Sequence, residues 1–187
     1  MADPELLSAR GALAQQTGKP PRRTPSLLRQ IHQCLSVAGL ALLSYFLVSH
    51  FFLQSVKVVG RSMVPTLQDS QQYLLNRWVY HFRAPQRTDV VVIRDPTDQG
   101  FSVKRIIGVA GDSILLKGGD VFVNGRKLAE PYLAANMSTY AFGKTGDQLI
   151  VCGKDQYFVL GDNRMNSADS RTYGPIPRQS ILGLIVR

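Results

Sequence analysis

The sequence predicts a mainly β protein: a curved or barrel-like antiparallel sheet domain behind one N-terminal transmembrane helix. Two observations support this. One apolar run, residues 34–53, contains no acid, lysine or arginine. After that run the chain consists of short β-prone pieces separated by turn residues, and no stretch has a convincing helical period. We therefore expect a flexible tail over 1–33, a membrane anchor over 34–53 and a β domain over 54–187.

The tail is basic and rich in Pro, Gly, Ala and Gln, a composition typical of flexible segments. A helical pattern begins near Ser26, a suitable N-cap. The formal net charge of the whole chain is +9. Beyond residue 53 the basic excess is dispersed, with no run of lysine and arginine interleaved with aromatics, which argues against a nucleic-acid partner. Apposition to anionic lipid explains the charge more simply.

The apolar run 34–53 has the length of a membrane span, because twenty helical residues cover about 30 Å. A cleaved signal peptide has a shorter apolar core and a small-residue cleavage site, and neither is found here. A buried core helix is the remaining alternative. Basic residues precede the run, so the positive-inside rule predicts a cytoplasmic N-terminus and an extracytoplasmic β domain. A bacterial plasma membrane fits this prediction, and so does a thylakoid membrane.

The domain after the span reads as a series of strands. Runs rich in β-branched and aromatic residues predict them at 55–59, 73–75, 78–82, 89–93, 101–109, 113–116, 121–123, 157–160 and 181–186. Gly118-Gly119 and Asn124-Gly125 are typical of hairpin turns. Residues 129–150 look like an excursion from the sheet, a long connection with little regular structure. The two cysteines, Cys34 and Cys152, lie far apart and form no C-x-x-C pair, so we expect neither a mutual disulfide nor a metal site.

The stretch from Gly60 to Leu67, directly after the span, is the first candidate for chemistry. Gly60 permits close backbone approach, while Pro65 fixes its own φ and favours an extended Val64. Ser62 therefore lies on a stiff, non-helical turn, which suits a nucleophile that meets an extended peptide. An ordinary polar turn is the other interpretation.

A nucleophilic serine needs a base, and histidine is the usual one. His32 and His50 flank or lie in the apolar run, which leaves His81, more typical of a plain strand residue. A neutral lysine is the other known base. Lys104 lies in the mostly apolar run 101–109, and a lysine facing an apolar surface loses hydration, which lowers its pKa. The alternative is that Lys104 and Arg105 are simply solvated.

The third candidate is the polar stretch 161–171, which is dense in hydroxyl, carboxylate and guanidinium groups. Such a loop can tie itself together through Asp–Arg pairs and place a hydroxyl beside a lysine. An elaborate polar turn has the same composition.

In this order behind an N-terminal span, three motifs resemble the type I signal peptidases, or leader peptidases. They are Ser62-Met63-x-Pro65-Thr66-Leu67, then Lys104-Arg105-Ile106-Ile107-Gly108, and then Gly161-Asp162-Asn163-Arg164-x-x-Ser167-x-Asp169-Ser170-Arg171. The resemblance covers nearly everything from about residue 54 onward. It implies a Ser–Lys endopeptidase that removes signal peptides from exported preproteins on the far side of the membrane, without a metal or organic cofactor.

The resemblance also implies roles for individual residues. Ser62 matches the nucleophile, Lys104 the general base and Ser167 the serine that holds the lysine amine. The residues that match buttressing positions are Asp162, Asp169, Arg171 and, directly after the lysine, Arg105.

Two positions depart from the family pattern. Gly60 replaces a serine that helps bind the oxyanion in some members, so the oxyanion hole must rely on backbone N–H groups such as that of Ser62. Met165 replaces an aspartate, so one buttressing contact is expected to be missing.

Substrate preference follows from the resemblance and from strand geometry. The family implies small residues at substrate positions −1 and −3, and an extended peptide turns both side chains toward the same surface. Val58, Met63 and Val103 are the expected walls of two shallow apolar pockets, with Gly60 beside them. Two rivals remain. Self-cleaving SOS repressors also use a Ser–Lys pair but are soluble and DNA-binding, and a catalytically dead binding module would share the fold without the activity.

Overall fold

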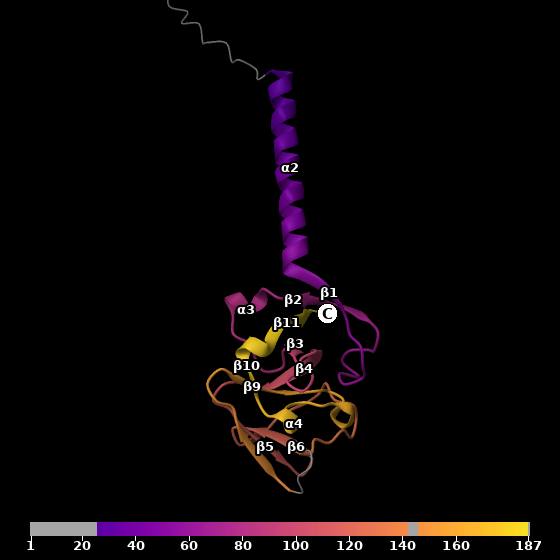
Figure 1. The fold of residues 1–187 in the computed structure, drawn as a ribbon, viewed down its shortest axis with the longest axis vertical. Helices are drawn as coiled ribbons and strands as arrows, with labels where there is room; N and C mark the ends of the chain where they lie inside the picture. The colour runs from indigo at the N-terminus through magenta and orange to yellow at the C-terminus, as the bar shows by residue number, and fades with distance from the viewer. Residues whose placement is uncertain (1–25, 142–145, 187) are drawn as a thin grey trace, which may run out of the picture. The chain divides into compact units, whose positions relative to one another are not determined.

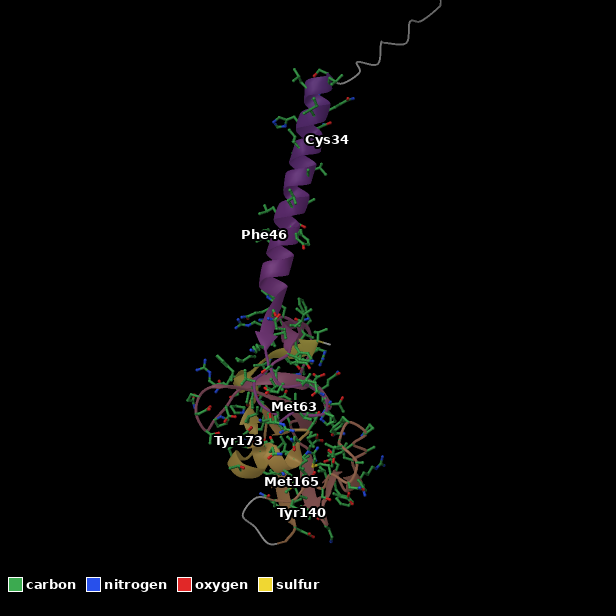
Figure 2. The ribbon with its side chains drawn as sticks, turned by 90° about the vertical axis from the view of Figure 1, so that its right-hand side faces the viewer. Cys34, Phe46, Met63, Tyr140, Met165 and Tyr173 are labelled. Atoms are coloured by element: carbon green, nitrogen blue, oxygen red, sulfur yellow. The ribbon has the colours of Figure 1, made fainter. Side chains whose placement is uncertain are left out.

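The computed structural model describes residues 26–141 and 146–186, and the chain divides into two units between Ser44 and Tyr45. Helix α2 (Leu27–Phe52) begins seven residues before the expected span, because the Ser26 carbonyl accepts hydrogen bonds from the backbone N–H groups of Arg29 and Gln30 at 2.8 and 3.2 Å. Its part from Leu27 to Leu47 is long and apolar enough to span a bilayer by length and composition. Figure 2 labels Cys34 and Phe46 on this helix. Most of the expected tail, 1–25, lies outside the described residues.

The second unit begins at Tyr45 and contains all the strands described; we call it the β unit. Its strands form two antiparallel sheets (Figure 1), which confirms the mainly β fold class. The larger sheet has the strand order β1 (Leu53–Lys57), β2 (Gln72–Asn76), β11 (Ile181–Val186), β3 (Val90–Arg94), β4 (Phe101–Gly108), β9 (Gln156–Leu160) and β10 (Ile176–Pro177). The smaller sheet has the order β7 (Arg126–Lys127), β6 (Asp120–Val123), β5 (Ser113–Lys117) and β8 (Gln148–Val151). The last of the described strands, β11, pairs with β2 on one side and β3 on the other, so it is an interior strand of the larger sheet.

Strand β9 and the end of β4, at Ile106 and Ile107, are apolar on both faces because both faces are covered. Ile106 and Val159 pack in one buried cluster with side chains of β3. Ile107 and Phe158, on the opposite face, pack in a second cluster with side chains of the smaller sheet. A strand buried on both sides reads as a continuous apolar run rather than an alternating one, which explains the Tyr-Phe-Val-Leu sequence of β9.

A third buried cluster fixes the turn that follows β1. Met63 and Leu67 of this turn are 1% and 0% exposed, and they pack against Val90 and Val92 of β3. Figure 2 labels Met63 among the strands of the β unit. The turn is therefore anchored to the sheet through its apolar side chains, while its polar residues remain nearer the surface.

The expectation of no helix after residue 53 is wrong in two places. Residues 78–82, expected as a strand, contain the one-turn helix α3 (Val79–Phe82), because Asn76 Oδ1 accepts hydrogen bonds from the backbone N–H groups of Trp78 and Val79, both at 3.0 Å. The polar stretch contains α4 (Ser170–Tyr173), capped by the Asp169 side chain. Short 3₁₀ turns also occur at Arg164–Asn166 and Arg178–Ser180.

The excursion expected over 129–150 is more ordered than the sequence indicates. Residues 128–141 contain no helix or strand but carry several hydrogen bonds to the rest of the domain, and 148–151 form strand β8. Residues 142–145 lie outside the described part of the chain.

Candidate active site

The turn that carries Ser62 is held by hydrogen bonds and by a glycine with positive φ. Gly60 has φ +106°, a region that side-chain-bearing residues rarely adopt, which explains why glycine is found here. Its N–H donates to Asp69 Oδ1 at 2.8 Å, and the Leu67 N–H donates to the Met63 carbonyl at 2.9 Å. Ser62 itself is half-buried. The backbone around the serine is therefore fixed from both sides.

The polar loop 161–167 is tied directly to this turn. The backbone N–H of Asn163 donates to the Ser62 carbonyl at 2.9 Å, and its side-chain amide donates to the Arg61 carbonyl at 3.1 Å. Two segments about a hundred residues apart in the sequence thus share a pair of hydrogen bonds at the candidate nucleophile.

Gly161 lies where these two segments come closest. A Cβ on Gly161 would lie 2.7 Å from the Ser62 carbonyl oxygen and closer still to the Ser167 hydroxyl. No side chain fits in that space, so Gly161 is required by close approach rather than by its φ. Ser167 is 4% exposed, and its Oγ has no hydrogen-bond partner among the described residues. A buried hydroxyl without a partner is unusual and marks a position that can accept a further contact.

Lys104 lies on β4 and is buried, with 3% of its surface exposed. Burial lowers its pKa, the nearby Asp169 and Asp95 raise it, Arg171 lowers it, and the net result is a pKa below the usual lysine value. No carboxylate of the described residues lies within 4 Å of its amine as an ion pair. The alternative of a solvated Lys104-Arg105 pair is therefore wrong, because both side chains are buried.

Two buried ion pairs lie beside these residues. Arg105 donates to both oxygens of Asp162 at 2.8 and 2.6 Å, and it also bonds the Thr88 carbonyl and the Thr66 hydroxyl. Arg171 donates in the same way to both oxygens of Asp169, at 2.8 and 2.9 Å. Asp169 further accepts the Gly161 N–H at 3.0 Å. The structure therefore brings together the four residues expected to buttress the site, as two bidentate pairs.

A groove of about 580 Å³ opens beside Ser62. Val58 and Val103 line it, together with Ser102 and side chains from β2, β3 and β11. Met63, expected as a wall, is 1% exposed and lies in the buried cluster below the turn. Gly60 is exposed at the start of the turn. The lining combines these aliphatic side chains with polar ones such as Lys57 and Arg94, and a hollow of this size next to a serine can hold a segment of peptide.

Several residues near the site carry contacts that the sequence analysis did not assign. Asp95, 8% exposed, directly follows β3 and accepts hydrogen bonds from the backbone and side chain of Thr97. Burial raises its pKa, but these bonds, together with Ser102 and Lys104, outweigh burial, and the pKa is lowered overall. Arg164 is fully buried and bonds Glu130 from the 128–141 segment. Gly161, Asn163 and Arg164 stood in the third motif, but nothing in their residue types indicated which contacts they make.

Two remaining expectations concern histidine and metal. His81 lies exposed in helix α3, with its ring 5.0 Å from that of Trp78. Within the described ranges, no three His, Cys, Asp or Glu side chains gather as metal ligands. Met165 is 70% exposed, so the position where the family pattern has an aspartate makes no buried contact here.

Comparison with known proteins identifies the family. The family model of signal peptidases, peptidase S26, matches residues 31–187. Signal peptidase I of Bacillus amyloliquefaciens is 39% identical over 142 residues, 73% of this chain and 74% of that protein. Signal peptidase I T of Bacillus subtilis is 38% identical over 149 residues, 77% of each chain. A crystal structure of a signal peptidase I from Enterococcus faecalis aligns with a TM-score of 0.48 at 30% identity, covering 56% of this chain and 98% of that one. The chain therefore belongs to the signal peptidase family, peptidase S26, and is a serine peptidase of the signal peptidase I type.

Proposed function

We propose that this protein is a membrane-bound endopeptidase that cleaves signal peptides from exported preproteins after small residues at −1 and −3, with Ser62 as nucleophile and Lys104 as general base. The observation that carries the proposal is the state of Lys104. Its side chain is buried, its pKa is lowered chiefly by that burial, and it pairs with no carboxylate of the described residues. A lysine can accept a proton only when it is neutral, and burial favours the neutral form.

The proposed reaction is acyl transfer in two steps. Neutral Lys104 takes the Oγ proton of Ser62 as Oγ attacks the scissile carbonyl, and the resulting ammonium then donates a proton to the leaving amine. The same lysine deprotonates a water that releases the acyl-enzyme. Ser62 and Lys104 suffice for every proton transfer in this sequence.

Backbone geometry supports an oxyanion hole at Ser62. The Gly60 N–H is already engaged by Asp69 at 2.8 Å, so it is not available to a substrate. The Ser62 N–H donates to no other residue in the described part of the chain. A free N–H at the nucleophile is the donor that a tetrahedral intermediate needs, and one such donor contributes about 10²- to 10³-fold to turnover in serine peptidases.

Ser167 and the two ion pairs are proposed to support the dyad. Ser167 Oγ is buried without a partner among the described residues, so it has a free hydrogen-bonding capacity that an amine can use. The Asp162–Arg105 and Asp169–Arg171 pairs hold the loop that carries it. Together they would orient the Lys104 amine toward Ser62.

The groove supports the proposed preference for small residues. An extended substrate points its side chains alternately to opposite sides, so the residues at −1 and −3 face the enzyme together. Val58 and Val103 line the groove that also contains Ser62, and we propose that their branched side chains form the walls that favour alanine over larger groups at these positions. Met63 would support this wall from below.

Helix α2 supports the proposed membrane location. It is apolar over a length that can span a bilayer, and basic residues precede it in the sequence. We propose a cytoplasmic N-terminus and an extracytoplasmic β unit, in a bacterial plasma membrane or a thylakoid membrane. Signal peptides enter the same bilayer, so an anchored enzyme meets its substrate at a raised effective concentration.

The test is cleavage of a preprotein by the full-length protein in detergent or liposomes. Wild type should cut at a single site after small residues, and its rate should rise with pH through the lowered pKa of Lys104, because only the neutral amine acts as base. Ser62→Ala should be inactive. Lys104→Arg keeps the positive charge but should also be inactive, because a guanidinium holds its proton at working pH.

Two results would contradict this proposal. A folded Lys104→Arg variant that cleaves at near wild-type rate would exclude Lys104 as the base. Absence of any cleavage by the wild type, in a membrane that supports a known signal peptidase, would favour a binding module instead.

A further inference from the structure

The 128–141 segment, between β7 and β8, is anchored on one side to the smaller sheet. The Leu128 N–H donates to the Val121 carbonyl and the Thr139 N–H to the Gly119 carbonyl, each at 2.8 Å. Tyr140 and Ser138 lie so close to Gly119 that a Cβ there would meet them at about 3.1 Å. These contacts hold the segment firmly although it contains no helix or strand.

On its other side the segment reaches the polar loop through a partly buried ion pair. Glu130 accepts from both terminal nitrogens of Arg164, at 2.5 and 3.3 Å. The Arg164 side chain is fully buried, and its guanidinium also donates to the Thr139 hydroxyl of the same segment. Every terminal nitrogen of Arg164 therefore bonds the 128–141 segment.

Arg164 connects the 128–141 segment to the candidate active site. Its Nε donates to the Gly161 carbonyl at 3.0 Å, and its own carbonyl accepts from Arg171 at 2.6 Å. Gly161 is the residue against which the Ser62 carbonyl and the Ser167 hydroxyl are packed. The path from Glu130 to the nucleophile turn thus contains one ion pair, one hydrogen bond and one close backbone contact.

Tyr132 provides a second connection, from Glu130 to Arg105. The Tyr132 hydroxyl donates to Glu130 Oε1 at 2.8 Å, and burial raises its pKa, so the hydroxyl keeps its proton. The Arg105 guanidinium lies over the Tyr132 ring at 3.9 Å from its centre, a distance at which cation–π attraction is favourable. Arg105 in turn holds both oxygens of Asp162. Glu130 is therefore connected to residues 161 and 162 from two directions.

We propose that Glu130, with Tyr132, is a positioning residue for catalysis: the 128–141 segment sets the place of loop 161–167 and thereby the relative positions of Ser62, Ser167 and Lys104. Neither Glu130 nor Tyr132 lines the groove, so the role is exerted through Arg164 and Arg105. The inference rests on the proposed function for its kinetic consequence, but the positional effect itself can be measured without activity.

The decisive variant is Glu130→Gln, which keeps the shape and removes the charge opposite buried Arg164. We expect kcat to fall about 10- to 100-fold, because displacements of an ångström or less at a catalytic group have effects of this size. KM should change little, because the groove is built by other strands. Glu130→Asp should recover part of the loss. Tyr132→Phe, which keeps the ring under Arg105 and loses only the hydroxyl, should cost several-fold at most.

Asp120→Asn is the matched control. It breaks the exposed ion pair of Asp120 with Lys127, at 2.7 Å, in the same smaller sheet but without a bond to loop 161–167. This variant should keep the wild-type kcat. If Glu130→Gln lowers only the melting temperature, and its kcat per folded molecule at low temperature equals that of the control, Glu130 is structural and the proposal is wrong.

Amide hydrogen exchange provides the readout that does not require activity. The Asn163 N–H, bonded to the Ser62 carbonyl, should exchange faster in Glu130→Gln than in Asp120→Asn. Unchanged protection over 161–167 would overturn the proposal even if the wild type proved inactive. A wild type that fails to cleave while protection falls as expected would instead contradict the proposed function alone.

Discussion

Gly161→Ala gives the most direct test of how the site is assembled. The added methyl would lie 2.7 Å from the Ser62 carbonyl oxygen, while ordinary van der Waals contact begins at 3.4 Å. Either the Ser62 backbone or loop 161–167 must therefore move by about 0.7 Å. The Ser167 side chain, which lies closer still, must move as well. The substitution thus separates the proposed nucleophile from the hydroxyl proposed to hold its base.

The expected loss follows from this displacement. A misplacement of about 1 Å at a catalytic group can lower the rate about 100-fold, so a shift of about 0.7 Å should lower kcat by roughly 10- to 100-fold. KM for a preprotein should change less, because Gly161 does not line the groove. The Asn163 bonds to the nucleophile turn should weaken in the same variant, because they join the two segments that the methyl pushes apart.

Gly183→Ala supplies the matched control. A Cβ at Gly183 on β11 would also lie 2.7 Å from a backbone carbonyl oxygen, that of Asn76, so the steric conflict is similar but it falls between two strands. Cleavage of a preprotein would be measured for both variants, with the folded fraction taken from circular dichroism. Leu75 and Arg77, which the added methyl would also meet, line the groove, so Gly183→Ala should lose stability and raise KM, but it should keep kcat per folded molecule. A Gly161→Ala variant with the same behaviour as the control would refute the proposed assembly of the site.

Three further predictions concern the lysine and the membrane. Ser167→Ala should stay folded and lose about 10- to 1000-fold in kcat, as measured by preprotein cleavage, because it removes the proposed partner of the amine. Asp95→Asn should move the acid limb of the kcat/KM profile to lower pH: Asp95 raises the pKa of Lys104, as Asp169 does and against Arg171, so its removal leaves more neutral amine at a given pH. An unchanged limb would show that Asp95 does not act on the lysine. Protease added to intact spheroplasts should digest the β unit and spare residues 1–30; digestion of those residues without lysis would reverse the proposed topology.

The strands were predictable because their sequence signal comes from burial. Residues 89–93, 101–109 and 157–160 are rich in β-branched or aromatic residues, and each lies on a strand of the larger sheet covered by buried clusters. Residues 78–82 have the same composition but contain a helical turn. The reason is that Asn76 Oδ1 accepts hydrogen bonds from the backbone N–H groups of Trp78 and Val79, which are then not available for pairing with a strand. The hydrogen bonds of a single side chain outweighed the local β propensity there.

The site was predictable only in part. The three motifs identified Ser62, Lys104 and Ser167 through their resemblance to a family, but the residues that hold these motifs together have no comparable signal. Arginine is rarely buried, so nothing in the sequence indicates that Arg164 is fully enclosed or that its partner is Glu130, 34 residues away. The need for glycine at position 161 likewise arises from two other segments, Ser62 and Ser167, which become neighbours only in the fold.

The arrangement of charges explains how a crowded polar site can still lower the pKa of a lysine. Three carboxylates around loop 161–171 are each bonded by an arginine: buried Asp162 by Arg105 at 2.6 Å, buried Asp169 by Arg171 at 2.8 Å and partly buried Glu130 by Arg164 at 2.5 Å. A carboxylate paired with an arginine exerts less negative potential on a third group, so these pairs favour the protonated Lys104 less than bare carboxylates would. For Asp169 this compensation is explicit, because its partner Arg171 lowers the pKa that Asp169 raises. Asp95, which is bonded by Thr97 rather than by an arginine, still raises the pKa of Lys104. Desolvation then becomes the leading influence on the amine. The ion pairs would therefore have two roles in catalysis. They fix the loop that carries Ser167, and they reduce the effect of their carboxylates on the pKa of Lys104, which must be neutral to act as a base.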